Sequence, residues 1–394
     1  MARKLASIVE IASCDPIPDT DRLSVTMMKG KGWKVVTGRD EFKPGDLAVY
    51  FEVDSYLPSD DERYAFLHDR CLRKFVSKSG QILKEGVRIK TCKLRGVISQ
   101  GLLMPIANFP EITDNIVDAG DGTGREIMLV ADKDCPGSTN GIDVVDAEVT
   151  EMLKVQHFDE IAEALRPATE GGNPIAADAM GKFPTDFIPK TDEERIQNLS
   201  DYWTTMKGRQ FEITEKRDGS SVTMFYSERI DPENPFGVCS RNLRLKPCDA
   251  NGKVPLPWKM AAKYGVEEKL RNLAKDGHEF AFQGELVGPG VNGNRDLLTD
   301  WEWQIFKIWD ITDGEYLTPD EARVMCESVG MTYVPVICEY MDVFDTFPTV
   351  DDLLKFAEGK TARGNEREGL VFKSTTRPYV SFKAVSNKYL LKQK

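Results

Sequence analysis

Residues 215–221 read EKRDGSS and directly follow FEIT (211–214), in which apolar and polar residues alternate. This alternation predicts a β-strand that ends at Lys216. A lysine amine can attack a phosphorus or carbonyl centre when burial or nearby cations lower its pKa. Asp218 points to the same side of an extended segment and can hold the water shell of a metal ion. The stretch therefore predicts a nucleophilic lysine beside a metal or, as the alternative, a plain polar hairpin turn.

Length and charge limit the class of protein. The chain has 394 residues, enough for two or three domains, and a net charge of −12, which argues against a general nucleic-acid binder. Residues 355–394 depart from this charge, with ten Lys and Arg against three Glu. This local excess indicates either a solvated face or one wall of a polyphosphate site.

Other residue types exclude further classes. The eight cysteines form no CxxC pair and the chain has only three histidines, so we expect neither a zinc site nor a disulfide framework. No stretch of eighteen apolar residues predicts a membrane span, and the N-terminus does not resemble a signal peptide. We therefore expect reduced, mostly buried thiols in an intracellular, cytoplasmic protein, with the nucleus and organelles as open alternatives.

The first part of the chain has the pattern of an all-β domain. Up to about residue 110, short alternating or apolar runs are separated by turn-rich pieces, which is typical of a small barrel or sandwich. Residues 111–150 are rich in Asp, Gly and Thr and predict loops or an insertion, and 150–166 could form a helix. GGNPIAADAMGKFP (171–184) has the composition of an interdomain linker.

A second unit begins near Thr191. The stretch TDEE predicts Thr191 as a helix N-cap, with Glu194 completing a capping box. Many short strands follow, with helices near 258–275 and 318–329, so the pattern is α+β rather than a regular βαβ alternation. Because no glycine-rich phosphate loop follows a strand, any nucleotide must be held by another device.

KRDGSS resembles the KxDG motif of the ATP-dependent ligases and mRNA capping enzymes, the covalent nucleotidyltransferase superfamily. Candidates for the five later motifs of that family follow in the family order over 175 residues. These are SRN (240–242), FAFQGEL (280–286), FKIWD (306–310), EGLVFK (368–373) and SFKAVSNKYL (381–390). Six motifs in one order are hard to obtain by chance.

The resemblance implies the chemistry of the site. In the family, the motif lysine attacks the α-phosphate of ATP and keeps AMP, while a basic residue of the last motif and Mg²⁺ or Mn²⁺ lower the pKa of the lysine. The residues implied for nucleotide binding are Glu215, Lys216, Ser221, Arg241, Glu285, Phe306, Glu368 and Lys383. Those implied for the metal are Asp218, Glu285 and Glu368.

Several of these residues have structural alternatives. Phe306 is the first choice for the ring that stacks on the base and Trp309 the second, although WEWQIFKIWD also has the pattern of a core strand. Arg241 is implied to contact the ribose and Glu285 its hydroxyls, although these two side chains could instead form a surface salt bridge.

The extra domain indicates the branch of the family. The chain ends eleven residues after Lys383, which leaves no room for the C-terminal OB domain of capping enzymes and DNA ligases. Residues 3–58 instead resemble the N-terminal OB module of one branch of RNA-repair ligases. PKTDEERIQN (189–198) resembles the helix that opens the ligase domain there, where Arg195 would approach the departing pyrophosphate or be an exposed helix cation.

The resemblance therefore implies an α+β protein. We expect an OB-like, all-β nucleic-acid-binding barrel with an insertion (1–165), a linker (166–188) and an adenylyltransferase domain of ATP-grasp-like ligase type on antiparallel sheets (189–394). It implies an ATP-dependent RNA ligase that joins a 3′-OH to a 5′-phosphate at nicks in duplex RNA or RNA-containing hybrids. We expect a monomer that does not bind membranes.

The barrel offers candidate RNA contacts, each with a structural alternative. Its aromatic residues could be stacking platforms or core, and its lysine cluster could contact phosphates or be a solvated hairpin tip. The residues are Trp33, Tyr50 and Phe51, and Lys29, Lys31 and Lys34.

One position departs from the RNA-ligase pattern. The last motif often reads KxK, and here Val385 replaces the second lysine. Either Lys388 could substitute for it or a single lysine could suffice. The alternatives are a capping-type guanylyltransferase, a DNA ligase, and a non-catalytic RNA-binding protein on an inactive ligase fold. Labelling with ATP or GTP separates them.

Overall fold

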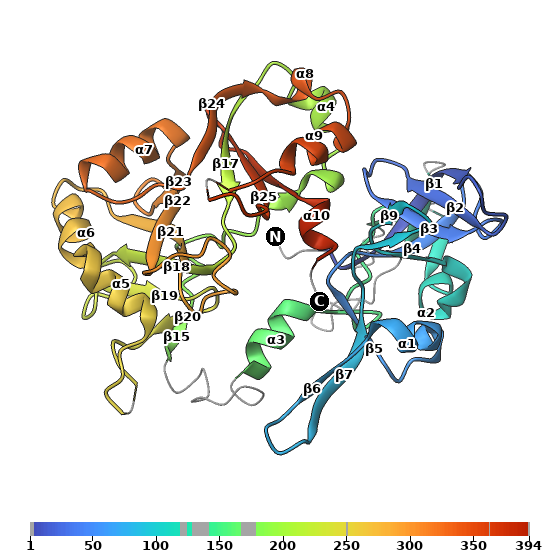
Figure 1. Cartoon of the computed structure of the whole chain (residues 1–394), viewed down its shortest axis with the longest axis horizontal. Coiled ribbons are helices and arrows are strands. Elements are labelled where there is room, and N and C mark those ends of the chain that lie inside the picture. Colours follow the sequence, from blue (N-terminus) through green and yellow to red (C-terminus); the bar gives the residue numbers. More distant parts are fainter. Residues whose placement is uncertain are drawn as a thin grey trace. The chain divides into compact units, whose positions relative to one another are not determined.

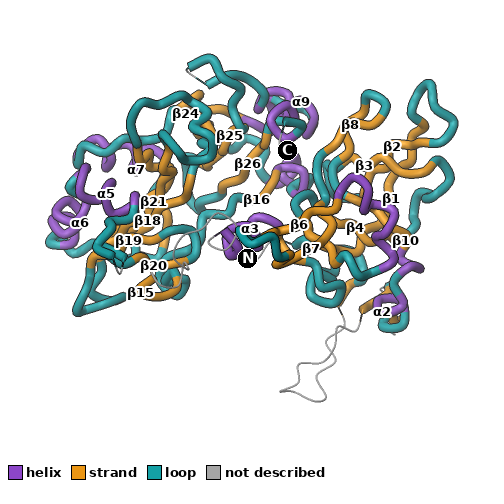
Figure 2. The backbone as a smooth tube through the Cα atoms, turned by 60° about the horizontal axis from the view of Figure 1, so that its bottom comes forward, coloured by secondary structure: helices purple, strands orange, loops and turns teal. Residues whose placement is uncertain are grey.

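The computed structural model describes residues 4–118, 124–127, 142–166, 179–249, 251–361 and 363–392. The chain divides into two compact units, 1–172 and 173–394 (Figures 1 and 2). Among the described residues, no helix is both long enough and apolar enough to span a bilayer.

The first unit is built on a five-stranded antiparallel sheet. Its strands, in spatial order, are β10 (Leu102–Pro105), β4 (Leu47–Phe51), β1 (Ala6–Pro16), β2 (Leu23–Met28) and β3 (Lys34–Gly38). The outer strands β3 and β10 contact each other, so the sheet closes into the predicted barrel. Trp33, Tyr50 and Phe51 are at most 2% exposed, which confirms that they are core residues and not stacking platforms.

A second sheet and short helices surround the barrel (Figure 1). The sheet contains β14 (Gln156–His157), β5 (Ser55–Pro58), β7 (Ile82–Arg88) and β6 (Leu72–Val76), and a hairpin is formed by β8 (Cys92–Leu94) and β9 (Val97–Ser99). The helices are η1 (Glu62–Leu67), α1 (His68–Cys71), η2 (Ile106–Asn108), α2 (Pro110–Thr113) and α3 (Phe158–Arg166).

One prediction for this unit was wrong in part. The region 111–150, expected as loops or an insertion, carries β11 (Ile116–Asp118), β12 (Arg125–Ile127) and β13 (Ile142–Asp143), while 119–123 and 128–141 lie outside the described residues. The helix expected at 150–166 begins only at Phe158. Lys154 has φ +55°, which no right-handed helix accommodates, and β14 then pairs with β5.

The second unit contains two sheets (Figure 1). The seven-stranded sheet has the order β15 (Ala179–Lys182), β20 (Leu243–Leu245), β19 (Phe236–Cys239), β18 (Ser220–Tyr226), β21 (Phe280–Val287), β22 (Glu302–Asp310) and β23 (Glu315–Tyr316). Apolar side chains of α5 (Leu256–Tyr264), α6 (Val266–Ala274) and α7 (Pro319–Ser328) pack on one face. The helix expected at 258–275 is thus two helices, separated by Gly265 at φ +59°.

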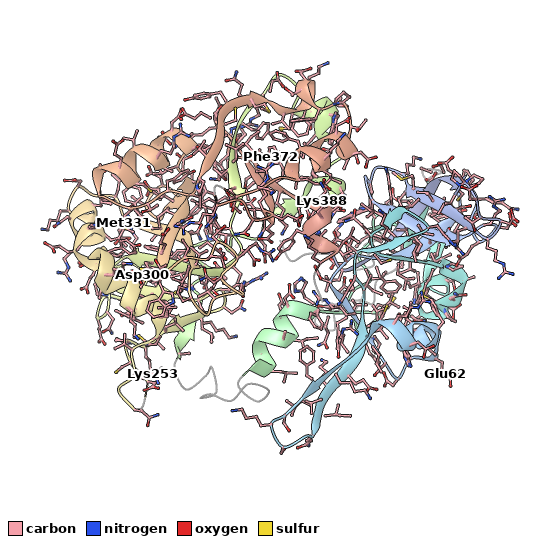
Figure 3. The ribbon with its side chains drawn as sticks, viewed as in Figure 1. Glu62, Lys253, Asp300, Met331, Phe372 and Lys388 are labelled. Atoms are coloured by element: carbon pink, nitrogen blue, oxygen red, sulfur yellow. The ribbon has the colours of Figure 1, made fainter. Side chains whose placement is uncertain are left out.

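The five-stranded sheet has the order β16 (Glu194–Arg195), β26 (Ser381–Val385), β25 (Gly369–Ser374), β17 (Gln210–Lys216) and β24 (Val336–Asp342). The helices of this region are η5 (Ile196–Asn198), α4 (Tyr202–Thr205), α8 (Val343–Thr346), α9 (Val350–Ala357) and α10 (Asn387–Leu390). Residues of α8 and α9 share a core with Phe372, whose ring stacks on Phe382 at 4.7 Å (Figure 3).

The helix predicted from Thr191 was wrong. The segment forms the short strand β16 and the turn η5, and Glu194 accepts hydrogen bonds from the Arg195 N–H (2.7 Å) and from Asn198 (2.9 Å). Glu193 is drawn into a buried ion pair with Lys307 of the seven-stranded sheet. Such tertiary contacts override a local capping signal. β15 lies within the residues expected as a linker, whereas 171–178 lie outside the described residues.

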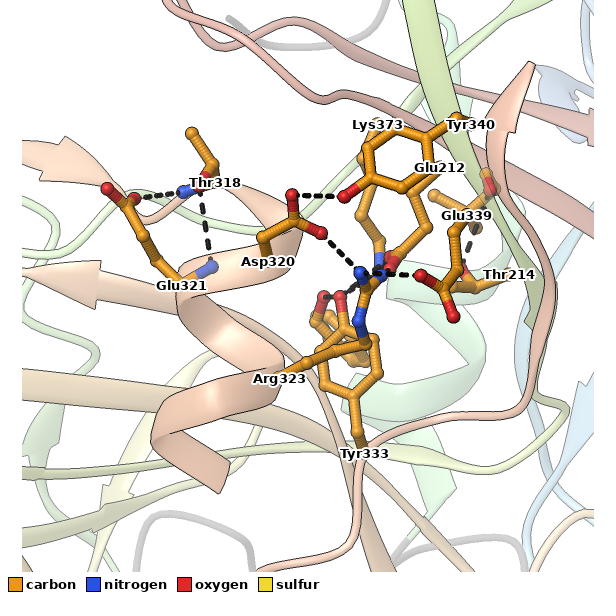
Figure 4. Close-up of polar contacts among 12 residues, drawn as sticks. Glu212, Thr214, Thr318, Asp320, Glu321, Arg323, Tyr333, Glu339, Tyr340 and Lys373 are labelled. Atoms are coloured by element: carbon orange, nitrogen blue, oxygen red, sulfur yellow. Dashed lines mark hydrogen bonds and ion pairs between the residues drawn. The ribbon is translucent and has the colours of Figure 1, made fainter. Parts of the chain in front are cut away.

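A buried polar network joins β17 and β25 to α7 (Figure 4). Glu212, which is 0% exposed, accepts hydrogen bonds from Lys373 Nζ (3.2 Å) and Tyr333 OH (2.9 Å) and pairs with Arg323. Because Glu212 and Lys216 are both on β17 four residues apart, the network anchors the strand that carries the motif lysine.

Candidate active site

The motif EKRDGSS marks the place where the chain passes from one sheet to the other. Lys216 is the last residue of β17 and Ser220 the first of β18, and the two strands belong to different sheets and do not pair. The alternative of a plain hairpin is therefore wrong. A Cβ on Gly219 would lie 2.3 Å from the Leu286 carbonyl oxygen, so only glycine lets the crossing segment pack against β21.

The register of the five-stranded sheet places the basic motif residues on one face. Lys216 lies opposite Gly369, and Val371, two residues further along β25, lies opposite Lys383. Lys383 in turn lies beside Arg195 of β16. Because side chains alternate between the two faces of a sheet, all three basic side chains leave the same face.

Gly369 is fixed by packing in the same way as Gly219. A Cβ on Gly369 would lie 2.3 Å from the Ala384 carbonyl oxygen on β26. The close approach of β25 to β26 at this point keeps Glu368, the preceding residue, next to the end of β17. Packing against β26 thus requires a glycine in the EGLVFK motif, and the position of the neighbouring Glu368 depends on that packing.

Cross-strand pairing also groups polar residues on the seven-stranded sheet. Ser221 of β18 lies opposite Glu285 of β21, which lies opposite Gln304 of β22. Directly opposite residues share a face, so the three side chains lie together. Gln304 is only 6% exposed, and its Oε1 has no hydrogen-bond partner among the described residues.

Lys216 forms an ion pair at the centre of these motifs. Its Nζ lies 2.7 Å from Glu368 Oε1, and the two side chains are 26% and 13% exposed. Burial lowers the pKa of Lys216, but the carboxylates of Glu368, Glu285 and Asp218 outweigh it and raise the pKa above its usual value. The lowering of this pKa that Lys383 and a bound metal would produce stays a prediction, because the raised value reflects the protein residues alone.

Glu285 feels the same crowding of charges. Burial raises the pKa of its carboxyl group to about 8; Glu368 and Asp218 add to the rise, and Lys216 opposes it. At neutral pH Glu285 is thus mostly protonated in this arrangement.

The three motif carboxylates suit a hard divalent cation in their chemistry, since Mg²⁺ and Mn²⁺ prefer oxygen donors. They do not form a closed metal cage. Among the described residues, a tight group of possible metal ligands lies elsewhere, at the other end of the β21–β22 pair. It consists of His278, Asp310 and Asp313, whose ligand atoms all lie within 4.8 Å of one another. Around Lys216, the ammonium itself takes the position of a cation between the acids.

Asp218 has partners that sequence reasoning missed. It accepts hydrogen bonds from Arg295 Nε (2.9 Å) and Tyr389 OH (3.0 Å), and its side chain is 13% exposed. Tyr389 belongs to the last motif, SFKAVSNKYL, which is the signal that could have identified it. Arg295 lies in the glycine-rich loop between β21 and β22, outside the motifs that the resemblance identifies.

The two aromatic candidates of FKIWD differ in their environments. On β22 the pairing shifts between Ile305 and Lys307, so Phe306 is the extra residue of a β-bulge and is only half-buried. Trp309 donates a hydrogen bond to the Phe187 carbonyl oxygen and packs edge-on against Tyr316 at 4.8 Å. Phe306 is thus the more available ring.

The structure tests the structural alternatives for two further basic candidates, Arg241 and Arg195. Arg241, in the turn between β19 and β20, pairs with Asp192 (2.7 Å) and not with Glu285, so the proposed salt bridge between the two was wrong. Arg195 is 5% exposed on β16, so it is not an exposed helix cation. The Glu215 side chain is buried and pairs with Arg217 (2.7 Å).

The second lysine of the KxK pattern has no substitute in Lys388. Val385 is buried with Tyr389 and Leu390. Lys388 is 62% exposed on α10 and pairs with Glu358 at 2.9 Å (Figure 3). Lys383 is therefore the lysine of this motif that shares a face with Lys216.

A lysine at the crossing of two antiparallel sheets, with acids from three motifs around it, is the arrangement expected of the covalent nucleotidyltransferases. A family model described as RNA ligase matches residues 209–390, and one described as an OB-fold domain matches residues 5–106. No curated protein matches the chain.

Solved structures of a Naegleria gruberi RNA ligase are similar over nearly the whole length. A variant with AMP and Mn is 30% identical with a TM-score of 0.76, and a variant with ATP and Mn is 30% identical with a TM-score of 0.75, each match covering 99% of both chains. The same ligase with PPi is 31% identical with a TM-score of 0.75, over 100% of this chain and 99% of that one. The chain belongs to the RNA ligase family, and the predicted fold is confirmed.

Proposed function

We propose that this protein is an ATP-dependent RNA ligase that joins 3′-OH and 5′-phosphate ends through a lysyl-AMP at Lys216. The observation that carries the proposal is the position of the Lys216 amine, which lies between the two sheets in contact with Glu368. The Naegleria ligase structures, which contain ATP, AMP, Mn or PPi, support a nucleotide at the equivalent place.

In the first step, the deprotonated Lys216 Nζ attacks the α-phosphorus of ATP. The new N–P bond forms as the bond to the bridging oxygen breaks, and pyrophosphate leaves. The amine must first lose a proton, and Glu368 Oε1, at 2.7 Å, is in hydrogen-bond contact to accept it.

The basic residues on the same sheet face stabilise the phosphates. Lys383 contacts the α-phosphate, and Arg195, its neighbour on β16, contacts the departing pyrophosphate. Phe306 stacks on the base, because the bulge presents its ring. Glu285 and Ser221, directly opposite each other, bind the ribose side, with Arg241 at the edge of the same sheet.

Asp218, Glu285 and Glu368 are the residues that would hold Mg²⁺ or Mn²⁺. When bound, the metal supplies positive charge that favours the neutral amine and offsets the charge that develops on the phosphates. Arg295 and Tyr389 hold Asp218 in place, so Asp218 acts through oriented water or after a change of partner.

In the later steps, an oxygen of the RNA 5′-phosphate attacks the lysyl-AMP phosphorus and releases the lysine. The 3′-OH then attacks the 5′-phosphorus, the phosphodiester forms, and AMP leaves. We propose nicks in duplex RNA or RNA-containing hybrids as the substrate and a monomer as the active form. Among the described residues, seven cysteines are free thiols and only two of them are buried, so the expectation of mostly buried thiols was wrong, and a reducing compartment stays a proposal.

The test is labelling of the protein with α-labelled ATP or GTP and a divalent metal, followed by a denaturing gel. Label from ATP is expected, and Lys216→Ala should abolish it. Lys207→Ala is the matched control, since Lys207 is an exposed lysine in the turn before β17 and should keep the label.

Sealing assays on nicked all-RNA, mixed and all-DNA duplexes then define the substrate. Label from GTP would select the capping alternative, and sealing of DNA alone would select DNA ligase. A labelled Lys216→Ala protein, or a parent protein without label, would refute the proposed chemistry.

A further inference from the structure

The first unit carries a concentration of positive charge that the proposed catalytic steps do not use. Between residues 70 and 95 the chain has nine Lys and Arg and one Glu, in a protein of net charge −12. These cations lie on α1, β6, β7 and β8 and in the segments that follow β6, β7 and β8 (Figures 1 and 2). Arg70, Lys74, Lys78, Lys93 and Arg95 are exposed.

Several of the cations converge on one spot, although they come from different elements. α1 contacts β7, and the Tyr56 hydroxyl donates a hydrogen bond to the Arg73 carbonyl oxygen (2.9 Å), which ties β6 to the sheet. The pKa of the Cys71 thiol is raised by burial and lowered by Arg73, Lys90 and Arg70, so all three cations lie within electrostatic reach of one sulfur.

The charges at this spot also act on one another. The pKa of Lys90 is lowered first by burial and then by the positive charges of Arg73 and Arg88. Folding thus holds like charges together against their repulsion, which leaves a local positive potential. Lys93, on β8, is adjacent to Cys92, and the charge of Arg70 opposes the rise that burial causes in the pKa of the Cys92 thiol. The β8–β9 hairpin therefore belongs to the same positively charged region.

We propose that Arg70, Arg73, Lys90, Lys93 and Arg95, here named the α1–β8 surface, bind the phosphate backbone of the RNA substrate. The inference rests on the proposed function and locates the RNA contact of the first unit. Arg70, Lys93 and Arg95 are exposed, and Arg73 and Lys90 are half-buried beside them. A polyphosphate strand is the partner that such a compact group of Arg and Lys fits, because each cation can neutralise one phosphate.

The lysines first expected to contact RNA are less suited to this role. Lys29 pairs with Glu10 (3.2 Å) and Lys31 with Asp146 (3.0 Å), so acidic partners already offset part of their charge. The α1–β8 surface has a larger local excess of positive charge.

The test compares two double variants of the full chain. Arg70→Gln/Lys93→Gln removes two exposed cations from the surface, and Arg22→Gln/Lys43→Gln removes an exposed arginine and an exposed lysine elsewhere on the same unit. Binding to a nicked RNA duplex with a 3′-deoxy end, which cannot be sealed, is followed by fluorescence anisotropy at several salt concentrations. Lysyl-AMP formation is measured in parallel.

Each lost phosphate contact reduces the slope of log K against log salt by about 0.9. Two lost contacts therefore weaken binding about 60-fold at 0.1 M salt relative to the parent, when 1 M salt is the reference at which the electrostatic contribution vanishes. We expect this loss for Arg70→Gln/Lys93→Gln, unchanged lysyl-AMP formation, and parent-like binding for the control.

Equal binding of the parent and Arg70→Gln/Lys93→Gln would overturn the inference, and so would an equal loss in the control variant. Failure of the proposed function has a different signature. A parent that binds RNA but takes no label from ATP would refute the ligase chemistry while the α1–β8 surface is still measured.

Discussion

Replacing Glu212 with glutamine tests whether the buried network of Figure 4 holds the motif strand in place. Glu212 is fully buried and is the common acceptor of Lys373, Tyr333 and Arg323. Glutamine keeps the shape and one acceptor oxygen but removes the charge. The ammonium of Lys373, itself 1% exposed, then has no carboxylate in contact.

The magnitude follows from this burial. Removing one partner of a buried ion pair costs about 3–5 kcal/mol, because the other charge stays buried and uncompensated. For a unit of this size, each 1 kcal/mol shifts the unfolding midpoint by about 2–4 °C. Glu212→Gln should therefore lower the midpoint of the second unit by roughly 6–20 °C.

The control uses the same arginine. Glu339 also pairs with Arg323, at 3.4 Å, but its side chain is 60% exposed, so Glu339→Gln should cost no more than about 1 kcal/mol. Thermal unfolding of both variants is followed by calorimetry, which resolves separate transitions of the two units. A Glu212→Gln midpoint within a few degrees of the Glu339→Gln midpoint would show that the network is not a stabilising anchor.

Four further outcomes concern the site. The rate of lysyl-AMP formation at fixed, subsaturating Mg²⁺ should rise with pH across the neutral range, because the raised pKa of Lys216 keeps the amine protonated; a flat profile would contradict this. Metal affinity of the nucleotide-free protein, measured by calorimetry, should rise with pH through about 8, since Glu285 must lose its proton, and Glu285→Gln should flatten that part of the rise. Phe306→Ala should raise the KM for ATP roughly 2- to 10-fold through lost stacking, more than Trp309→Phe does, and the reverse order would assign the base to Trp309. Glu368→Ala should slow sealing at every metal concentration, and parent-like sealing would remove Glu368 from the metal site.

Local pattern predicted the parts of the site in which one strand fixes one residue. FEIT alternates, so the end of β17 at Lys216 followed from period-two patterning. The glycines of KRDGSS and EGLVFK belong to the family motifs, and the structure gives their physical reason in the backbone contacts of Gly219 and Gly369. The strand end depends on residues close in sequence, which is why the sequence showed it, whereas the glycines were found through the family motifs and their packing partners, Leu286 and Ala384, are distant in sequence.

Features that depend on distant residues were not predictable in the same way. The segment that begins at Thr191 has a sound capping signal, yet contacts from Lys307 and Arg241, more than forty residues away, pull it into an extended path. Likewise, Arg295 reaches Asp218 from a loop 77 residues later. No local pattern encodes such pairings, because the sequence around each of these charged residues is equally compatible with a side chain that contacts only water.

The charge around Lys216 is a further feature that depends on residues distant in sequence. Counting motif residues suggests a lysine activated by Lys383, but folding brings Glu368, Glu285 and Asp218 to the amine and raises its pKa. The acids that would hold a metal therefore also hold the proton on the nucleophile when no metal is bound. It follows that metal binding and loss of the lysine proton are linked, because the metal ion and the ammonium both place positive charge among the same carboxylates. On this argument the motif acids delay the attack until a cation replaces the ammonium charge, and raising the metal concentration should shift the pH profile of lysyl-AMP formation toward lower pH.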